Sequence, residues 1–295
     1  MNTTVGVLAR PDLVEAGGAL HELTGWLAGR GVAVLLDPRT AALAPGAVSP
    51  EAIADAKDVA GRADALVVLG GDGTLLGVSH LVARRGVPVL GVNFGSLGFL
   101  TEIALPELYP ALEGVLRGSY EFDERRMLHA EVRCDGRTRE SGDVLNDVVI
   151  TKAALSRIIE LDVSVDGLFV SAFRADGLIV SSPTGSTAYN LAAGGPILHP
   201  ALPAIVLTPI CPHMLTNRPL VVGDETRVEV RLHGARGVEV HVTFDGQVGC
   251  PLTSEDAVVV TRSPRSLRLV RAPNRDFFAV LRTKLKWGES TARRR

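Results

Sequence analysis

Residues 65–77 read ALVVLGGDGTLLG, and they give the clearest signal of the fold class. A short aliphatic run leads into the loop GGDGT, and a helical pattern begins directly after it. In open α/β sheets, ligands bind at the carboxyl ends of the parallel strands. Glycines let backbone N–H groups approach such a ligand closely, and a helix N-terminus adds a partial positive charge. The loop is therefore predicted to bind phosphate through Gly70, Gly71, Gly73 and Thr74.

Asp72 is the unusual member of this loop, because a carboxylate repels the anion that the glycines would bind. Its position suits a group that accepts a proton from an attacking hydroxyl, or one that contacts a metal ion or a sugar hydroxyl. The alternative is a tight turn in which Asp72 only caps the following helix. We favour the chemical role, because the whole pattern lies between a strand and a helix.

The segments around this loop alternate between strand and helix signals, which is typical of a parallel sheet covered on both faces. Strands are predicted at residues 4–9, 32–36, 65–69 and 87–92, and helices at 11–29, 74–86 and 105–118. Proline near the start and glycine past the end mark the helix boundaries.

Beyond residue 125 the sequence changes to short β-type runs. The Asp-Gly pairs at 135–136, 166–167 and 245–246 lie between such runs. Asp-Gly readily adopts the positive φ angles of a two-residue turn, so each pair predicts a hairpin. Short helices are predicted only at 187–193 and 275–287. This part of the chain is therefore expected to be an antiparallel β-sandwich.

Together these patterns predict two domains. An α/β domain with a Rossmann-like parallel sheet covers residues 1–124 and is joined by the C-terminal helix at 275–287. An all-β sandwich domain covers residues 125–274. Residues 288–295 are predicted to be a flexible tail.

Composition excludes several classes of protein. The 295 residues carry a formal net charge of −2 and only 4% aromatic residues, which argues against a nucleic-acid-binding surface. Three widely spaced cysteines form no disulfide framework or zinc motif. The amino-terminal residues lack a signal-peptide pattern, and no apolar run is long enough to span a membrane. We expect a cytoplasmic protein with no membrane or nucleic-acid partner.

Two common phosphate-binding motifs are missing. No Gly-Lys pair exists, so there is no Walker A loop. The glycines at 71, 73 and 77 are spaced one residue away from the dinucleotide fingerprint, and no acidic residue follows at the distance that a ribose requires. With only four lysines in the chain, phosphates are expected to be bound by glycine backbone, Mg²⁺ and arginine.

The chain resembles the NAD kinase family. The resemblance rests on GGDGT at 70–74, GVNFGSLGFL at 91–100, LNDVVI at 145–150 and the block DGLIVSSPTGSTAYNLAAGGPILHP at 176–200. It implies a kinase that transfers the γ-phosphoryl of ATP to the 2′-hydroxyl of the adenosine ribose of NAD. It also implies Mg²⁺ bound with ATP rather than at a protein-only metal site, and a homodimer or homotetramer.

The resemblance also assigns roles to individual residues. Asp72 would be the catalytic proton acceptor and would contact NAD together with Gly73. Tyr189 would stack on adenine and Asn190 would pair with it through its amide. The remaining NAD contacts implied in this way are Asn146, Asp147, Arg157, Arg174, Asp176, Thr187, Ala188, Leu191, Ala192 and Gln247.

Two alternatives stay open at this point. A diacylglycerol-type lipid kinase shares GGDGT but has no use for residues 182–196. A catalytically silent NAD-binding regulator would have no need of Asp72. The sequence leaves open whether polyphosphate replaces ATP, and whether NADH is accepted.

Overall fold

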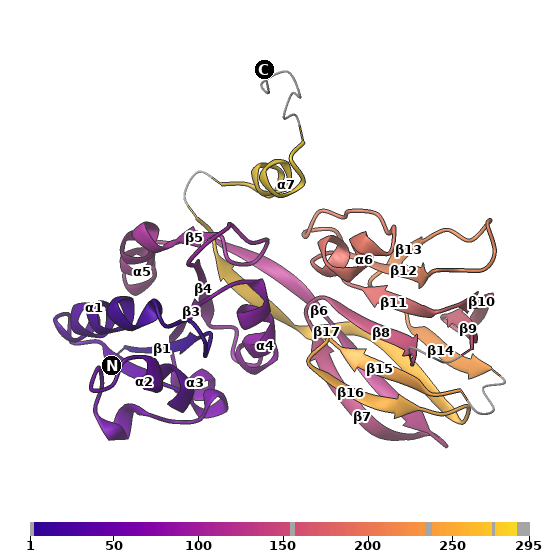
Figure 1. The fold of residues 1–295 in the computed structure, drawn as a ribbon, viewed down its shortest axis with the longest axis horizontal. Helices are drawn as coiled ribbons and strands as arrows, with labels where there is room; N and C mark the ends of the chain where they lie inside the picture. Colours follow the sequence, from indigo (N-terminus) through magenta and orange to yellow (C-terminus); the bar gives the residue numbers. More distant parts are fainter. Residues whose placement is uncertain (1–2, 154–156, 234–237, 273–274, 288–295) are drawn as a thin grey trace. The chain divides into compact units, whose positions relative to one another are not determined.

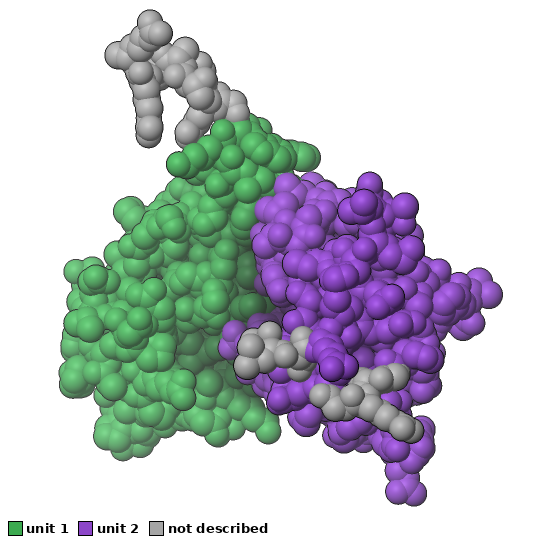
Figure 2. Space-filling view, turned by 45° about the vertical axis from the view of Figure 1, so that its right-hand side comes forward, with its two compact units in different colours: residues 1–124, 267–295 green, residues 125–266 purple. Residues whose placement is uncertain are grey.

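A computed structural model describes residues 3–153, 157–233, 238–272 and 275–287. The chain forms two compact units (Figure 2). Unit 1 comprises Met1–Glu124 and Leu267–Arg295, and unit 2 comprises Arg125–Ser266. The tail predicted at 288–295 lies outside the described residues.

Unit 1 is built on a parallel sheet with the strand order β2-β1-β3-β4, which confirms the predicted Rossmann-like arrangement (Figure 1). Its strands are β1 (Thr4–Ala9), β2 (Ala33–Leu36), β3 (Ala65–Leu69), β4 (Pro88–Asn93) and the short β5 (Ile103–Ala104). Every residue of β3 and β4 is buried, as expected for strands covered on both faces.

The helices of unit 1 connect these strands. They are α1 (Ala16–Ala28), α2 (Pro38–Leu43), α3 (Ala56–Arg62), α4 (Asp72–Val82), α5 (Leu108–Leu116) and α7 (Phe277–Leu285), with 3₁₀ turns η1 (Pro50–Ala52) and η2 (Leu105–Glu107). Aspartates at positions 37, 55 and 276 cap α2, α3 and α7 by accepting a backbone N–H three residues ahead. The first helix begins later than the proline at position 11 predicts, because residues 11–15 form turns.

Unit 2 is a β-sandwich, as predicted. One sheet has the order β10-β9-β14-β17 and continues through β6 and β7, and the other is antiparallel with the order β13-β12-β11-β8-β15-β16. The strands of the first sheet are β6 (Phe122–Cys134), β7 (Arg137–Val144), β9 (Ile159–Val165), β10 (Leu168–Ala175), β14 (Val228–His233) and β17 (Asp256–Val270). Those of the second are β8 (Asp147–Lys152), β11 (Gly177–Ser181), β12 (Ala204–Ile210), β13 (Leu220–Gly223), β15 (Val240–Phe244) and β16 (Val248–Leu252).

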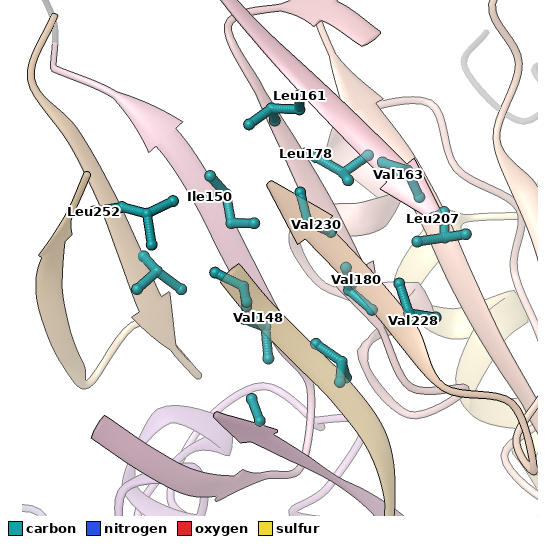
Figure 3. Packing of buried hydrophobic residues seen from close by; sticks show 14 of the residues in the cluster. Val148, Ile150, Leu161, Val163, Leu178, Val180, Leu207, Val228, Val230 and Leu252 are labelled. Atoms are coloured by element: carbon teal, nitrogen blue, oxygen red, sulfur yellow. The ribbon is translucent and has the colours of Figure 1, made fainter. Parts of the chain in front are cut away.

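The core of unit 2 lies between these two sheets (Figure 3). Alternate residues of facing strands, such as Val148 and Ile150 on β8 and Val228 and Val230 on β14, point into it. All four are fully buried, and each such side chain contributes roughly 1.5–3 kcal/mol of transfer free energy. This alternation follows from the two-residue period of a strand.

All three Asp-Gly pairs form the predicted hairpin turns, with positive φ at both residues of each pair. They connect β6 to β7, β9 to β10 and β15 to β16. Two apolar runs near the C-terminus, expected as separate strands, are one long strand, β17. Its first part pairs with β14 in unit 2, and Arg268 and Leu269 pair with β4 in unit 1.

Candidate functional site

The GGDGT loop of unit 1 connects the end of β3 to the start of α4. The N–H of Gly70 donates to the carbonyl of Val92 on the neighbouring strand at 2.9 Å, which fixes where the loop leaves the sheet. Gly71 is the N-cap of α4 and Gly73 is exposed in its first turn. The first N–H groups of a helix have no carbonyl partner within it, so this turn offers donors to an anion.

Asp72 is the first residue of α4, and its side chain does not cap that helix. Instead the carboxylate accepts hydrogen bonds from the loop after β4. Its Oδ2 accepts from the N–H of Phe99 at 2.8 Å. Its Oδ1 accepts from the N–H of Leu100 and from both the N–H and the hydroxyl of Thr101, each at 3.0 Å. The helix-cap alternative is therefore wrong, and Asp72 is held by residues 27–29 positions away.

Gly98 is required for this arrangement. A Cβ at position 98 would overlap the Oδ1 of Asp72 and the hydroxyl of Thr101. Gly95 in the same loop has open space around it. The close approach of the loop backbone to Asp72 thus depends on one glycine and not on the other.

In unit 2, Asn146 and Asp147 lie where β7 ends and β8 begins. The sequence DVLNDVVIT at 143–151 has the composition of one β-type run, but Val144 ends β7 and Asp147 starts β8. The interruption coincides with hydrogen bonds from the N–H groups of Leu145, Asn146 and Asp147 to the side chain of Asp245. These backbone N–H groups donate to the Asp245 carboxylate and not to a neighbouring strand.

Asp147 is buried and Asp245 is half-buried, and the two carboxyl groups are close enough to affect each other. Burial raises the pKa of Asp147 to about 7, and the charge of Asp245 adds to the effect. Burial raises the pKa of Asp245 to about 6, against the opposing effect of its three backbone hydrogen bonds. The pKa values of both carboxyl groups are therefore raised from the ordinary aspartate range toward neutrality.

The segment after β11 contains η3 (Gly185–Thr187) and α6 (Tyr189–Ala192), close to the helix predicted at 187–193. Tyr189 is 45% exposed, so its ring is free to stack on a base. Thr187, Ala188 and Leu191 are partly exposed, and Ala192 is exposed. The hydroxyl of Thr184 is buried and has no hydrogen-bond partner in the described part of the chain.

Asn190 does not fit its predicted role. Its side chain is fully buried, its amide N–H₂ donates to the carbonyls of Ser186 and Pro196 at 3.0 Å, and its Oδ1 accepts from the Thr208 hydroxyl at 2.6 Å. All its polar atoms are therefore used to hold the segment. The interpretation of this amide as the group that pairs with adenine is wrong for this structure.

The other predicted residues of unit 2 form two groups. Gln247 follows the Asp245 turn, at the end of β8 where Asn146 and Asp147 lie. Arg174 and Asp176 lie at the opposite end of β8 and β11. The exposed Arg157 lies two residues before β9, whose first residue, Ile159, pairs with Ala175. There Lys152 forms an ion pair with Asp176 at 3.5 Å. β11 has five residues, so the Cα atoms at its two ends are roughly 13 Å apart.

Sequence reasoning missed three contributors to these sites. Thr101 contacts Asp72, Asp245 holds the segment 145–147, and the Ser182 hydroxyl donates to the carbonyl of Leu145 at 2.5 Å. The sequence around Asp245 predicts only a hairpin turn. No local pattern could identify its partners, because they lie 98–100 residues away in the sequence.

Unit 1 has a cavity away from the predicted site residues. The cavity has a volume of about 790 Å³, is lined by residues of α5 and by 119–121, 270–272 and 275–276, and contains none of those site residues.

Among the described residues, no group of three His, Cys, Asp or Glu side chains could hold a metal ion. No helix in the described ranges is long and apolar enough to cross a membrane.

Two protein-family domains match the chain, one in its N-terminal part and one in its C-terminal part. The ATP-NAD kinase N-terminal domain matches residues 5–120, and the ATP-NAD kinase C-terminal domain matches residues 145–272. An NAD kinase of Geotalea daltonii is 51% identical over 285 residues, covering 97% of this chain and 99% of its own length. An NAD kinase of Citrifermentans bemidjiense is 50% identical over 291 residues, with the same coverage of both chains.

Solved structures agree with this assignment. Yeast NADH kinase complexed with NADH superposes with a TM-score of 0.86 at 26% identity, covering 98% of this chain and 89% of that one. An NAD kinase from Archaeoglobus fulgidus in complex with ATP has the same fold, with a TM-score of 0.75 at 24% identity over 95% of this chain and 99% of that one.

Proposed function

The chain belongs to the ATP-NAD kinase family, and we propose that it transfers the γ-phosphoryl of ATP to the 2′-hydroxyl of the adenosine ribose of NAD, giving NADP. The observation that carries this proposal is the Asp72 carboxylate, fixed by four hydrogen bonds beside the N-terminus of α4. A fixed carboxylate next to free backbone donors is what a phosphotransferase with an alcohol acceptor requires.

Asp72 would act through its Oδ2 atom. Each carboxylate oxygen can accept about two hydrogen bonds. Oδ1 already accepts three, whereas Oδ2 accepts one, from Phe99. Oδ2 therefore has room to accept the ribose hydroxyl. An aspartate is a weak base toward an alcohol, so it would orient the hydroxyl and take its proton late in the transfer.

The phosphates of ATP would be bound by the loop of Gly70, Gly71, Gly73 and Thr74, supported by the N-terminal turn of α4. Mg²⁺ would arrive as part of the ATP substrate and offset phosphate charge.

NAD would be bound in unit 2 by residues at the two ends of β8 and β11. Tyr189 supplies an exposed ring for adenine, and Thr187, Ala188, Leu191 and Ala192 supply backbone and small contacts beside it. Asn146, Asp147 and Gln247 would contact the dinucleotide at one end of the strands, and Arg157, Arg174 and Asp176 at the other. Asn190 would contribute by shaping α6 and not by its amide.

A homodimer or homotetramer is part of the proposal. Leu168 and Phe169 on β10 are 74% and 69% exposed, and β10 is the edge strand of its sheet. An exposed apolar edge strand is typical of a surface that pairs with another chain. Sedimentation should find a dimer or tetramer, and Phe169→Glu should shift it toward monomer. A monomer at working concentration would contradict this part of the proposal.

One assay tests the activity. The chain is incubated with Mg²⁺, ATP and NAD, and NADP is detected with a strictly NADP-dependent dehydrogenase. Asp72→Asn is the matched control. NADP formation that depends on Asp72 supports the proposal, whereas NAD binding without turnover identifies a silent regulator. Because the yeast relative is a NADH kinase, a second arm offers NADH, and a third replaces ATP with polyphosphate.

A further inference from the structure

The Asp245 side chain makes an unusual set of contacts in unit 2. Its Oδ2 accepts from the N–H of Leu145 at 2.7 Å. Its Oδ1 accepts from the N–H groups of Asn146 at 2.7 Å and Asp147 at 3.1 Å. Its own N–H donates to the carbonyl of Asp147 at 2.9 Å. One residue of the β15–β16 turn thus binds three consecutive residues of another segment.

The carbonyl side of the same segment is held by the end of β11. The N–H of Ser182 donates to the carbonyl of Asn146 at 2.8 Å, and the Ser182 hydroxyl donates to the carbonyl of Leu145. Gly185 lies so close that a Cβ there would overlap the Asn146 carbonyl. Residues 145–147 are therefore fixed from both sides, by Asp245 through their N–H groups and by 182–185 through their carbonyls.

Turn formation does not explain these contacts. The Asp-Gly turns at 135 and 166 have the same left-handed φ angles, near 50°, as the turn at 245. Yet Asp135 is exposed, and Asp166 accepts a single backbone N–H, from Arg227. Asp245 is half-buried and accepts three backbone N–H groups from another segment, which a turn alone does not require.

We propose that Asp245 is a positioning residue for NAD, which gathers the N–H groups of residues 145–147 and thereby sets the directions of the Asn146 and Asp147 side chains. The proposal rests on the proposed function, in which those two side chains contact NAD. A continuous strand through this segment would point them to opposite faces. The three convergent hydrogen bonds accompany a bend at residues 145–146 in place of that strand, so both side chains depend on Asp245.

The test compares Asp245→Asn, Asp245→Ala and the control Asp135→Asn in the full-length chain. Asparagine tolerates the left-handed backbone as aspartate does, so the turn is kept. Its amide nitrogen cannot accept a hydrogen bond, so one oxygen's contacts are lost. We expect Asp245→Asn to raise the KM for NAD about tenfold, Asp245→Ala to raise it further, and both to leave the KM for ATP within about twofold. Asp135→Asn should change neither constant.

Asn146→Ala separates the two proposals. If it leaves the KM for NAD unchanged, the NAD-binding role of this segment fails and the positioning role fails with it. If Asn146→Ala raises the KM for NAD but Asp245→Asn does not, only the positioning role fails. Equal changes in both KM values, or loss of folding in both Asp245 variants as seen by circular dichroism, would assign Asp245 to stability alone and overturn the proposal.

Discussion

The side chains of Asp72 in unit 1 and Asp245 in unit 2 accept the same pattern of backbone hydrogen bonds. Each is followed by glycine, and each accepts three consecutive backbone N–H groups from a remote segment, 99–101 for Asp72 and 145–147 for Asp245. In both, Oδ2 accepts only one hydrogen bond. They differ in their position: Asp72 lies at the N-terminus of α4, whereas Asp245 lies in the turn between β15 and β16.

A hydrogen-bond pattern therefore does not by itself identify a reacting group. The same three bonds orient a carboxylate for use in Asp72 and orient other side chains in Asp245. What separates the roles is the surroundings of the carboxylate: backbone donors suited to phosphate in one case and candidate NAD ligands in the other. The following experiments test that distinction.

The largest effect is expected for Asp72→Asn. Loss of a group that accepts a proton in the transition state lowers kcat by roughly 10²–10⁴-fold. The KM for NAD should stay within about twofold, unlike the change expected for Asp245→Asn. Steady-state kinetics on both substrates measure this. A variant with wild-type kcat, or one altered only in KM, would mean that the two aspartates share a positioning role.

A smaller effect is expected for Gly98→Ala. The added methyl group would overlap the Asp72 carboxylate and the Thr101 hydroxyl, so the loop must move and release the carboxylate. Such overpacking costs about 1–3 kcal/mol of unfolding free energy, and kcat should fall about tenfold or more. Chemical denaturation and kinetics are compared with Gly95→Ala, which has open space. If the two variants behave alike, the close approach of the loop is unimportant.

The smallest effect is expected for Asp147→Asn, which should change how the stability of the protein depends on pH. The pKa of Asp147 is raised from 3.8 to about 7, so the folded state binds a proton that the unfolded state has released. Stability from this group is complete below pH ~4 and is lost as the pH rises toward 7. Asp147→Asn should remove this loss and raise Tm at pH 8 by a few degrees relative to wild type, but not at pH 4.

Thermal melts at both pH values test this, with the exposed Asp135→Asn as the control for a simple change of net charge. A Tm difference between wild type and Asp147→Asn that is equal at both pH values would show that the Asp147 carboxyl titrates normally. The pKa of Asp147 would then not differ from that of an ordinary surface carboxyl group.

Local patterns predicted much of the fold. The strand at 65–69, the helix after GGDGT and all three Asp-Gly hairpins follow from rules that act over a few residues. The strand β12 was missed, although AIVLTPI is buried throughout, because its internal proline is unusual in a strand. Strand β7 was only partly predicted, because its exposed polar residues do not alternate with apolar ones.

The sites could be predicted only in part. Family resemblance selected Asp72, Asn146 and Asp147, but not the residues that hold them. Thr101 and Asp245 act through contacts that span 29 and about 100 residues of sequence, which no local pattern encodes. Asn190 fails for a related reason: its amide suits adenine, and only the fold shows that Ser186, Pro196 and Thr208 already use it.

The discontinuity of unit 1 has a consequence for synthesis on the ribosome. Unit 2 is one continuous segment, whereas unit 1 needs both the first 124 residues and the last 29. The pairing of Arg268 and Leu269 with β4 cannot form until nearly the whole chain has been made. We therefore expect the middle of the polypeptide to reach its final form first, while the nascent unit with the GGDGT loop waits for its last strand.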